Sequence, residues 1–195
     1  MPEIMGGGGA LFDMDGDGDL DAYLVQSGDV RLPPEQQPPK QLFRNEGDGR
    51  FTDVTAGSGA EAPGYGQGVA AGDYDNDGDV DLYVTNVGPD RLLRNEGGGR
   101  FTDVSAAAGI QAPGWGASAT FWDYDRDGLL DIAVAQYLNW SVEGESECYN
   151  NMGGLDYCSP LNYGAPARAL LWHNLGGGRF EERAEAAGLT TYGTG

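Results

Sequence analysis

The chain contains few of the residue types that most enzymes and nucleic-acid-binding proteins need. Its 195 residues include one histidine, two cysteines and 11 lysines and arginines. A single histidine and the absence of a nucleophile motif argue against an enzyme. The basic residues form no patch, which argues against binding of DNA or RNA phosphates. No apolar run approaches the roughly 18 residues of a membrane-spanning helix, so we expect no membrane insertion.

Acidic residues, by contrast, are abundant and concentrated. Asp and Glu number 31, which gives a formal net charge of −20. Fourteen of these acidic residues lie in three copies of one loop. The copies read DMDGDGDLD at 13–21, DYDNDGDVD at 73–81 and DYDRDGLLD at 123–131. Each copy has carboxylates at positions 1, 3, 5 and 9 and a glycine at position 6.

This arrangement of carboxylates is typical of a site for a hard cation. Carboxylates about 5 Å apart repel one another by roughly 3 kcal/mol per pair at an effective dielectric near 20. Calcium removes that repulsion, because it accepts six to eight oxygen ligands in a flexible shell. The three loops therefore predict up to three Ca²⁺ ions. The alternative is that they are polar turns held by Asp side chains without a metal.

Comparison of the three loops assigns a role to each position. Position 7 is Leu129 in the third loop, and a leucine side chain cannot bind a cation, so position 7 is expected to donate its backbone carbonyl. The loops are not EF-hands, because position 12 is not Glu and a strand-like run follows each loop. The predicted ligands are Asp13, Asp15, Asp17, Asp19 and Asp21; Asp73, Asp75, Asp77, Asp79 and Asp81; and Asp123, Asp125, Asp127, Leu129 and Asp131, with Asp19, Asp79 and Leu129 acting through their carbonyls.

The loops belong to a longer repeat, which predicts the fold. LFRNEGDGRFTDVT begins at Leu42, LLRNEGGGRFTDVS at Leu92 and LWHNLGGGRFEERA at Leu171. Self-similarity at this period indicates a propeller or array. We therefore expect an all-β chain, a partial β-propeller with about three blades of four antiparallel strands. The predicted blades cover about 5–56, about 66–106 and about 116–185, the last with a cysteine-containing insert at 138–166. The strands of the second blade are expected at 68–72, 81–86, 91–95 and 100–104. Short turns of helix are expected at 105–109 and 184–188.

These motifs resemble a known family of repeats. A Dx[DN]x[DN]GxxD loop followed by a strand resembles the FG-GAP and VCBS repeats of integrin-like β-propellers. The runs PEIMGGGGALFDMDGDGDLDAYLVQ and LLRNEGGGRFTDVSAAAGI, with the cysteine-containing insert, look most like the ASPIC/UnbV and cartilage acidic protein family. The resemblance implies a secreted or surface calcium-binding propeller of about seven blades, within the four to eight typical of the class. Three blades then indicate a fragment of a larger propeller, or three-blade units that associate through open blade edges.

The predicted third blade contains both cysteines and the single histidine of the chain. Cys148 and Cys158 lie ten residues apart in the insert. A disulfide between them would indicate an oxidising compartment, and the alternative is two unlinked thiols in a flexible loop. His173 occupies the strand position of Arg44 and Arg94, which favours a structural or surface role. The extra length of the first and third blades falls between their second and third strands, on the face opposite the acidic loops.

Two classes of function remain at this point. The first is a calcium-binding, non-catalytic extracellular interaction or adhesion module. The second is a carbohydrate-binding propeller or an accessory part of a secreted enzyme, in which Tyr65 and Trp115 would stack on a sugar; packing between blades is the favoured role for both. The partner, a protein or a glycan, is not identified. We expect an extracellular, cell-surface or periplasmic location. The N-terminus shows no signal peptide, as expected if Met1 is internal, whereas a true start at Met1 would indicate the cytosol.

Overall fold

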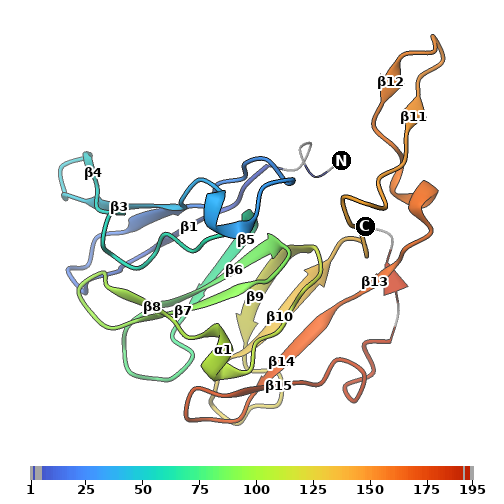
Figure 1. Cartoon of the computed structure of the whole chain (residues 1–195). Coiled ribbons are helices and arrows are strands. Elements are labelled where there is room, and N and C mark those ends of the chain that lie inside the picture. Colours follow the sequence, from blue (N-terminus) through green and yellow to red (C-terminus); the bar gives the residue numbers. More distant parts are fainter. Residues whose placement is uncertain (1, 3–5, 191, 194–195) are drawn as a thin grey trace.

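Three four-stranded antiparallel sheets follow one another along the chain, which confirms the all-β, blade-like fold (Figure 1). A computed structural model describes residue 2, residues 6–190 and the backbone of residues 192–193. Met5, where the first blade was expected to begin, lies outside the described residues. The strands are β1 (Gly9–Phe12), β2 (Asp21–Leu24), β3 (Gln41–Asn45) and β4 (Phe51–Asp53); β5 (Tyr65–Gly72), β6 (Asp81–Val87), β7 (Arg91–Asn95) and β8 (Phe101–Asp103); and β9 (Gly116–Trp122), β10 (Asp131–Gln136), β14 (Leu170–Asn174) and β15 (Phe180–Glu182).

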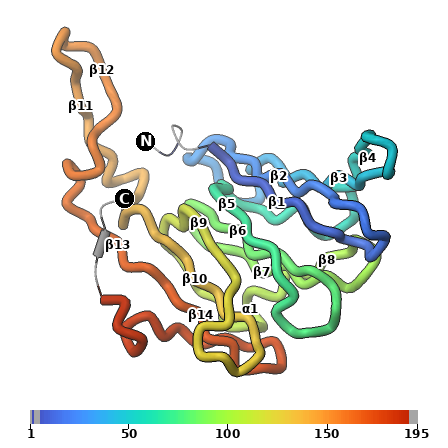
Figure 2. The backbone as a smooth tube through the Cα atoms, turned by 180° about the vertical axis from the view of Figure 1, so that it is seen from behind, coloured from blue at the N-terminus to red at the C-terminus, as the bar shows by residue number. Residues whose placement is uncertain are grey.

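Each sheet runs in chain order from an inner strand to an outer one. The orders are β1-β2-β3-β4, β5-β6-β7-β8 and β9-β10-β14-β15. The inner strands β1, β5 and β9 lie next to one another, as Figure 2 shows. Shorter elements lie in the connections between these strands and after the last of them. They are α1 (Ser105–Ala108), the 3₁₀ turns η2 (Pro34–Gln36) and η3 (Pro160–Tyr163), and the strands β11 (Cys148–Tyr149), β12 (Leu155–Asp156), β13 (Ala167–Arg168) and β16 (Tyr192–Gly193). The helical turn expected at 105–109 forms α1, whereas 184–188 forms turns only.

The core consists of the layers between adjacent blades. In β6 successive side chains point to opposite faces of the sheet, so Leu82 and Val84 pack against the first blade. Tyr83, between them, packs against the third blade. Because the second blade is covered on both faces, six of the seven residues of β6 are buried. This explains why its sequence, DLYVTNV, lacks a clear polar alternation.

The first blade shows what the uncovered face of such a unit looks like. Phe101 and Val84 of the second blade are 6% and 0% exposed, because the first blade covers them. Their repeat equivalents in the first blade, Phe51 and Leu24, are 50% and 42% exposed. Apolar surface of this kind is available for the predicted self-association, which would remove it from water.

Aromatic residues at the start of β5 and β9 pack inside the molecule. Tyr65 and Trp115 are 4% and 1% exposed. The indole Nε1–H of Trp115 donates to Gln67 Oε1 at 3.1 Å, and its ring contacts Tyr137 and Trp140. The expected packing role is therefore confirmed for both residues, and neither presents a ring face for stacking on a sugar.

A buried polar network crosses the second blade. Trp172 Nε1–H donates to the hydroxyl of Tyr83, which donates to Asp90 Oδ2 at 2.9 Å. Asp90 Oδ1 accepts the backbone N–H of Asn86, and Asn86 Oδ1 accepts from the ammonium of Lys40 at 3.3 Å. Burial raises the pKa of Asp90 to about 7 and lowers the pKa of Lys40 to about 8. Both charged forms therefore carry a desolvation cost in the folded protein.

We expect the metal-free protein to lose stability between pH 5 and pH 8 because of Asp90. Its pKa is about 7 in the folded chain against 3.8 for the free side chain, so the folded state keeps a proton that the unfolded state has lost. Linkage gives a loss of roughly 2–3 kcal/mol across this interval. In Asp90→Asn, which mimics the protonated carboxyl, this part of the pH dependence should vanish. Urea unfolding in EDTA at pH 5 and at pH 8 measures the change in the free energy of unfolding for the unaltered chain and for Asp90→Asn. An equal change in the two proteins would contradict the assignment.

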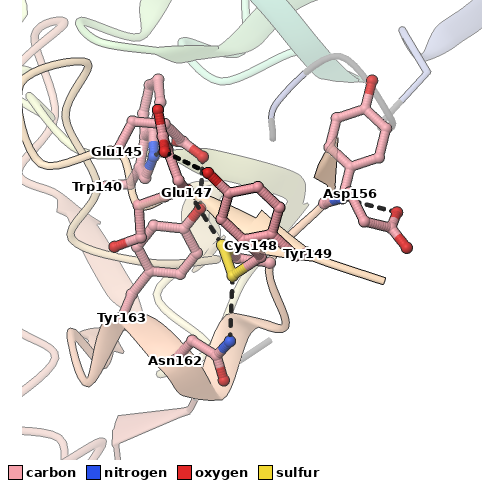
Figure 3. The surroundings of a disulfide bond; sticks show 11 residues. Trp140, Glu145, Glu147, Cys148, Tyr149, Asp156, Asn162 and Tyr163 are labelled. Atoms are coloured by element: carbon pink, nitrogen blue, oxygen red, sulfur yellow. Dashed lines mark hydrogen bonds between the residues drawn. A yellow bond between two sulfur atoms is a disulfide. The ribbon is translucent and has the colours of Figure 1, made fainter. Parts of the chain in front are cut away.

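The insert forms an arm that projects away from the blades (Figure 1). Its hairpin of β11 and β12 is closed by the Cys148–Cys158 disulfide, as predicted (Figure 3). The arm exposes Met152, Leu155 and Leu161, and the segment 138–166 has four acidic residues and no lysine or arginine. A pocket of about 560 Å³ lies between the arm and the loop after β2. The inserts of the first and third blades thus meet on one face.

Candidate metal sites

The three acidic loops connect the first strand of each blade to the second, and they share one backbone conformation. The glycine at position 6 has a φ of 91°, 97° and 89° in the three copies, in the left-handed region that favours glycine. Position 4 is also left-handed, with Gly16 at 79°, Asn76 at 60° and Arg126 at 67°. Arginine rarely adopts this conformation, so the loop imposes it. The repeated conformation explains why glycine recurs at position 6.

The aspartate at position 1 closes the loop upon itself. In each copy its Oδ2 accepts the backbone N–H of the position 6 glycine. The bonds run from Gly18, Gly78 and Gly128 to Asp13, Asp73 and Asp123, at 2.9, 3.0 and 3.0 Å. The bond from Gly18 lowers the pKa of Asp13, which keeps this carboxylate charged.

The aspartate at position 9 is buried and held by two backbone amides. Asp21, Asp81 and Asp131 are 0%, 0% and 1% exposed. One oxygen of each accepts the N–H of position 2, and the other accepts the N–H of the asparagine that ends the third strand of the blade. The second set of donors, Asn45, Asn95 and Asn174, lies at 2.8 Å in all three blades. Burial raises the pKa of Asp81 to about 7, so its charge lacks full compensation.

The aspartate at position 3 supplies the test of whether a cation fits. Asp15 Oδ1 and Asp75 Oδ1 are buried, and neither has a hydrogen-bond partner among the described residues. Burial, followed by neighbouring carboxylates, raises the pKa of both side chains. A buried oxygen without a donor costs free energy, and a bound cation would supply the missing interaction. The first two loops therefore fit a hard cation.

Carboxylates converge in all three loops. Asp13, Asp15 and Asp17 place one oxygen each within 4.8 Å of one another, and Asp123, Asp125 and Asp127 do the same. The corresponding group in the second loop is Asp73, Asp75 and Asp81. In the first and third loops, the position 9 aspartates, Asp21 and Asp131, accept the backbone N–H of position 2. Neither belongs to the group of three carboxylates formed by positions 1, 3 and 5 of its own loop. Several oxygens at this separation can share one divalent ion.

The side chain at position 7 points elsewhere. A β-carbon on Gly47 would lie 2.8 Å from Asp19 Oδ2, and one on Gly97 would lie 3.4 Å from Asp79 Oδ2. A β-carbon on the equivalent Gly176 would lie 3.6 Å from Leu129 Cδ1. These glycines belong to the turn between the third and fourth strands. The position 7 side chain therefore lies against this turn, and whether its carbonyl binds an ion stays a prediction.

The third site contains a residue that the sequence did not assign to it. His173 Nδ1 lies 3.0 Å from Asp131 Oδ1 and 3.7 Å from Asp125 Oδ2. Its repeat equivalents, Arg44 and Arg94, instead pair with a glutamate two residues later. The only available signal was that the third copy reads HNL where the others read RNE. His173 is a hydrogen-bond partner of a predicted ligand, and the arginines are not.

Asparagine side chains link each loop to the next blade. Asn95 Nδ2–H donates to Met14 O in the first loop and to Val80 O in the second, at 3.0 and 3.2 Å. Asn174 Nδ2–H donates to Tyr74 O and to Leu130 O, and thus joins the second loop to the third. The loops are therefore part of the interface between blades.

Repeated four-stranded blades with acidic first loops define a propeller-type repeat protein. The family described as FG-GAP-like repeat matches residues 13–84 and 73–134, more than half of the chain. The chain belongs to this family. Comparison with curated proteins finds no match. Among the described residues, the structure has no helix of the length and apolarity that crossing a bilayer requires.

One solved structure similar to this chain is a lectin from Agrocybe aegerita, described by its recognition of non-reducing terminal N-acetylglucosamine. The two are 21% identical, with a TM-score of 0.37, over 88% of this chain and 49% of the lectin. The chain thus spans about half the length of that protein.

Proposed function

We propose that the chain is a calcium-binding, non-catalytic interaction module in which Ca²⁺ is held by the acidic loops. Positions 1, 3, 5 and 9 would supply side-chain oxygens, and position 7 would supply a carbonyl. The ion would neutralise clustered carboxylates and fix the loops against the neighbouring blades; no reaction is assigned to it. Within the FG-GAP-like repeats, the sequence motifs favour the ASPIC/UnbV and cartilage acidic protein group, and an extracellular or periplasmic location.

The observation that carries the proposal is the pair of orphaned oxygens, Asp15 Oδ1 and Asp75 Oδ1. A turn that served only to reverse the chain would place a donor against these atoms, as the turn does at positions 1 and 9. Carboxylate oxygens without donors, grouped with further carboxylates, are suited to a hard divalent cation. Oxygen-only donor sets in the first two loops favour Ca²⁺ or Mg²⁺ over transition metals, and the flexible loop favours the larger ion.

The interaction part of the proposal rests on the arm. Its apolar side chains are exposed on a hairpin that a disulfide constrains, so binding would order few additional torsions. The acidic side chains of 138–166 favour a partner with a basic surface. The disulfide itself is consistent with an oxidising compartment.

Titration calorimetry with Ca²⁺ tests the proposal. We expect saturable binding, with the stoichiometry reduced by one in Asp15→Ala, which leaves no side-chain oxygen at position 3. Asp19→Ala is the matched control, because it removes the same charge from the same loop at a side chain that points to the turn. Absence of Ca²⁺ binding by the unaltered chain would refute the proposal, and equal loss in the two variants would refute the ligand assignment.

A further inference from the structure

The third blade lacks an ion pair that the other two blades share. In the first two blades, Arg44 Nη2 and Arg94 Nη2 contact Glu46 Oε1 and Glu96 Oε1 at 2.9 and 2.6 Å. These ion pairs hold the guanidinium groups beside the turn. The third blade has His173 and Leu175 instead, so both members of the pair have changed together. An imidazole, which can bind a metal, thus replaces a guanidinium group, which cannot.

The histidine turns toward the acidic loop. Its Nδ1 lies 3.0 Å from Asp131 Oδ1 and 3.7 Å from Asp125 Oδ2, and its side chain is 10% exposed. The ligand atoms of the three residues all lie within 4.8 Å of one another. The residues come from three places, since Asp125 lies in the loop, Asp131 begins β10 and His173 lies in β14.

The surroundings fix these groups in place. Asp131 accepts the backbone N–H groups of Asn174 and Tyr124, at 2.8 and 3.1 Å. The ring of Tyr124 packs edge-on against the imidazole, with centroids 5.6 Å apart. Hydrogen bonds to a ligand carboxylate and contacts that orient a ligand histidine are typical outer-shell features of metal sites.

The donor set differs in kind from that of the first two loops. Tetrahedral ligands at about 2.0–2.2 Å from a metal lie roughly 3.3–3.6 Å apart. The two Nδ1–oxygen separations lie close to this range. One imidazole and two carboxylates suit Zn²⁺ and related ions, whereas Ca²⁺ prefers a shell of oxygens alone.

We propose that Asp125, Asp131 and His173 form a site for a transition-metal dication such as Zn²⁺. The metal would bind the Nδ1 lone pair, so the imidazole proton would reside on Nε2, and water would complete the shell. Asp125 also belongs to the carboxylate group of the third loop, so this ion takes the place of the third Ca²⁺. The inference concerns the third loop alone and holds whether or not the first two loops bind calcium.

The single histidine makes the test direct, because a ¹⁵N-histidine label reports on His173 alone. With Ca²⁺ in excess, one equivalent of Zn²⁺ should move the Nδ1 resonance to a metal-bound position and leave a proton on Nε2. The exposed Asp125 allows a matched variant that keeps the histidine. In Asp125→Asn the same Zn²⁺ addition should leave Nδ1 in its metal-free position. An unchanged Nδ1 resonance in the unaltered chain would overturn the proposal.

A second variant measures affinity. His173→Arg with Leu175→Glu restores the ion pair of the second blade, so it is expected to fold. Competition with a chromophoric chelator should show Zn²⁺ affinity falling at least tenfold in this variant. Ca²⁺ titration of the same variant separates the two proposals, because the first two loops should still bind calcium. Equal Zn²⁺ affinity in both proteins would show that His173 only orients Asp131.

Discussion

Calcium is expected to raise the free energy of unfolding by about 2.7 kcal/mol for each of the first two loops, at free calcium 100 times the dissociation constant. The first two loops together would contribute about 5 kcal/mol. For a chain of 195 residues this corresponds to an increase in Tm of roughly 10–20 °C. The physical reason is that folding brings the carboxylates together, and only the folded chain presents them to one ion.

Thermal unfolding in excess Ca²⁺ and in EDTA measures this effect. The control is the double variant Asp15→Ala with Asp75→Ala, which removes the two orphaned oxygens and should respond weakly to calcium. Mg²⁺ at the same concentration should protect less, because it requires a more rigid octahedral shell. Identical melting of the unaltered chain in calcium and in EDTA would show that the loops are polar turns.

Two aspartates of the second loop, Asp79 and Asp81, are expected to differ strongly in their contribution to calcium binding. Asp79→Leu should leave calcium affinity at the second loop within about tenfold, or 1.4 kcal/mol, because this side chain lies against Gly97. Asp81→Ala should lose far more. It removes a charged ligand and leaves the amides of Tyr74 and Asn95 without an acceptor, at a cost of about 1–3 kcal/mol for each buried group.

Calcium titration and urea unfolding of both variants measure the difference. Because Asp81→Ala also removes two structural bonds, its near-ultraviolet circular dichroism must first show an ordered core. Asp21→Ala provides the same substitution in the first loop and should leave the second site able to bind calcium. If Asp79→Leu abolished binding while Asp81→Ala preserved it, the assignment of positions 7 and 9 would be reversed.

Much of the fold follows from local sequence signals. The glycine at position 6 requires a positive φ, and the strand-like run after each loop sets where the second strand begins. The strands expected at 81–86 and 91–95 agree closely with β6 and β7. These features depend on turn chemistry and alternation, which are properties of neighbouring residues. The strand expected at 68–72 begins earlier, at Tyr65, because a β-bulge near Gly66 lets the pairing with β6 continue.

The parts that sequence did not predict depend on contacts between distant segments. Position in the repeat equated His173 with two arginines, but the direction of a side chain depends on its partner. Glu46 and Glu96 form ion pairs with the two arginines, and Leu175 offers no such contact. The reach of Asn95 to Met14, 81 residues earlier, likewise follows from blade packing. Neither contact leaves a periodic signal in the chain.

The asparagine amides have a consequence for how ions would bind along the array. Asn95 holds one carbonyl of the first loop and one of the second, and Asn174 does the same for the second and third. An ion that orders one loop also fixes the amide that its neighbour shares, so the next ion meets a smaller entropic cost. We expect adjacent loops to fill with positive cooperativity, equal in both directions.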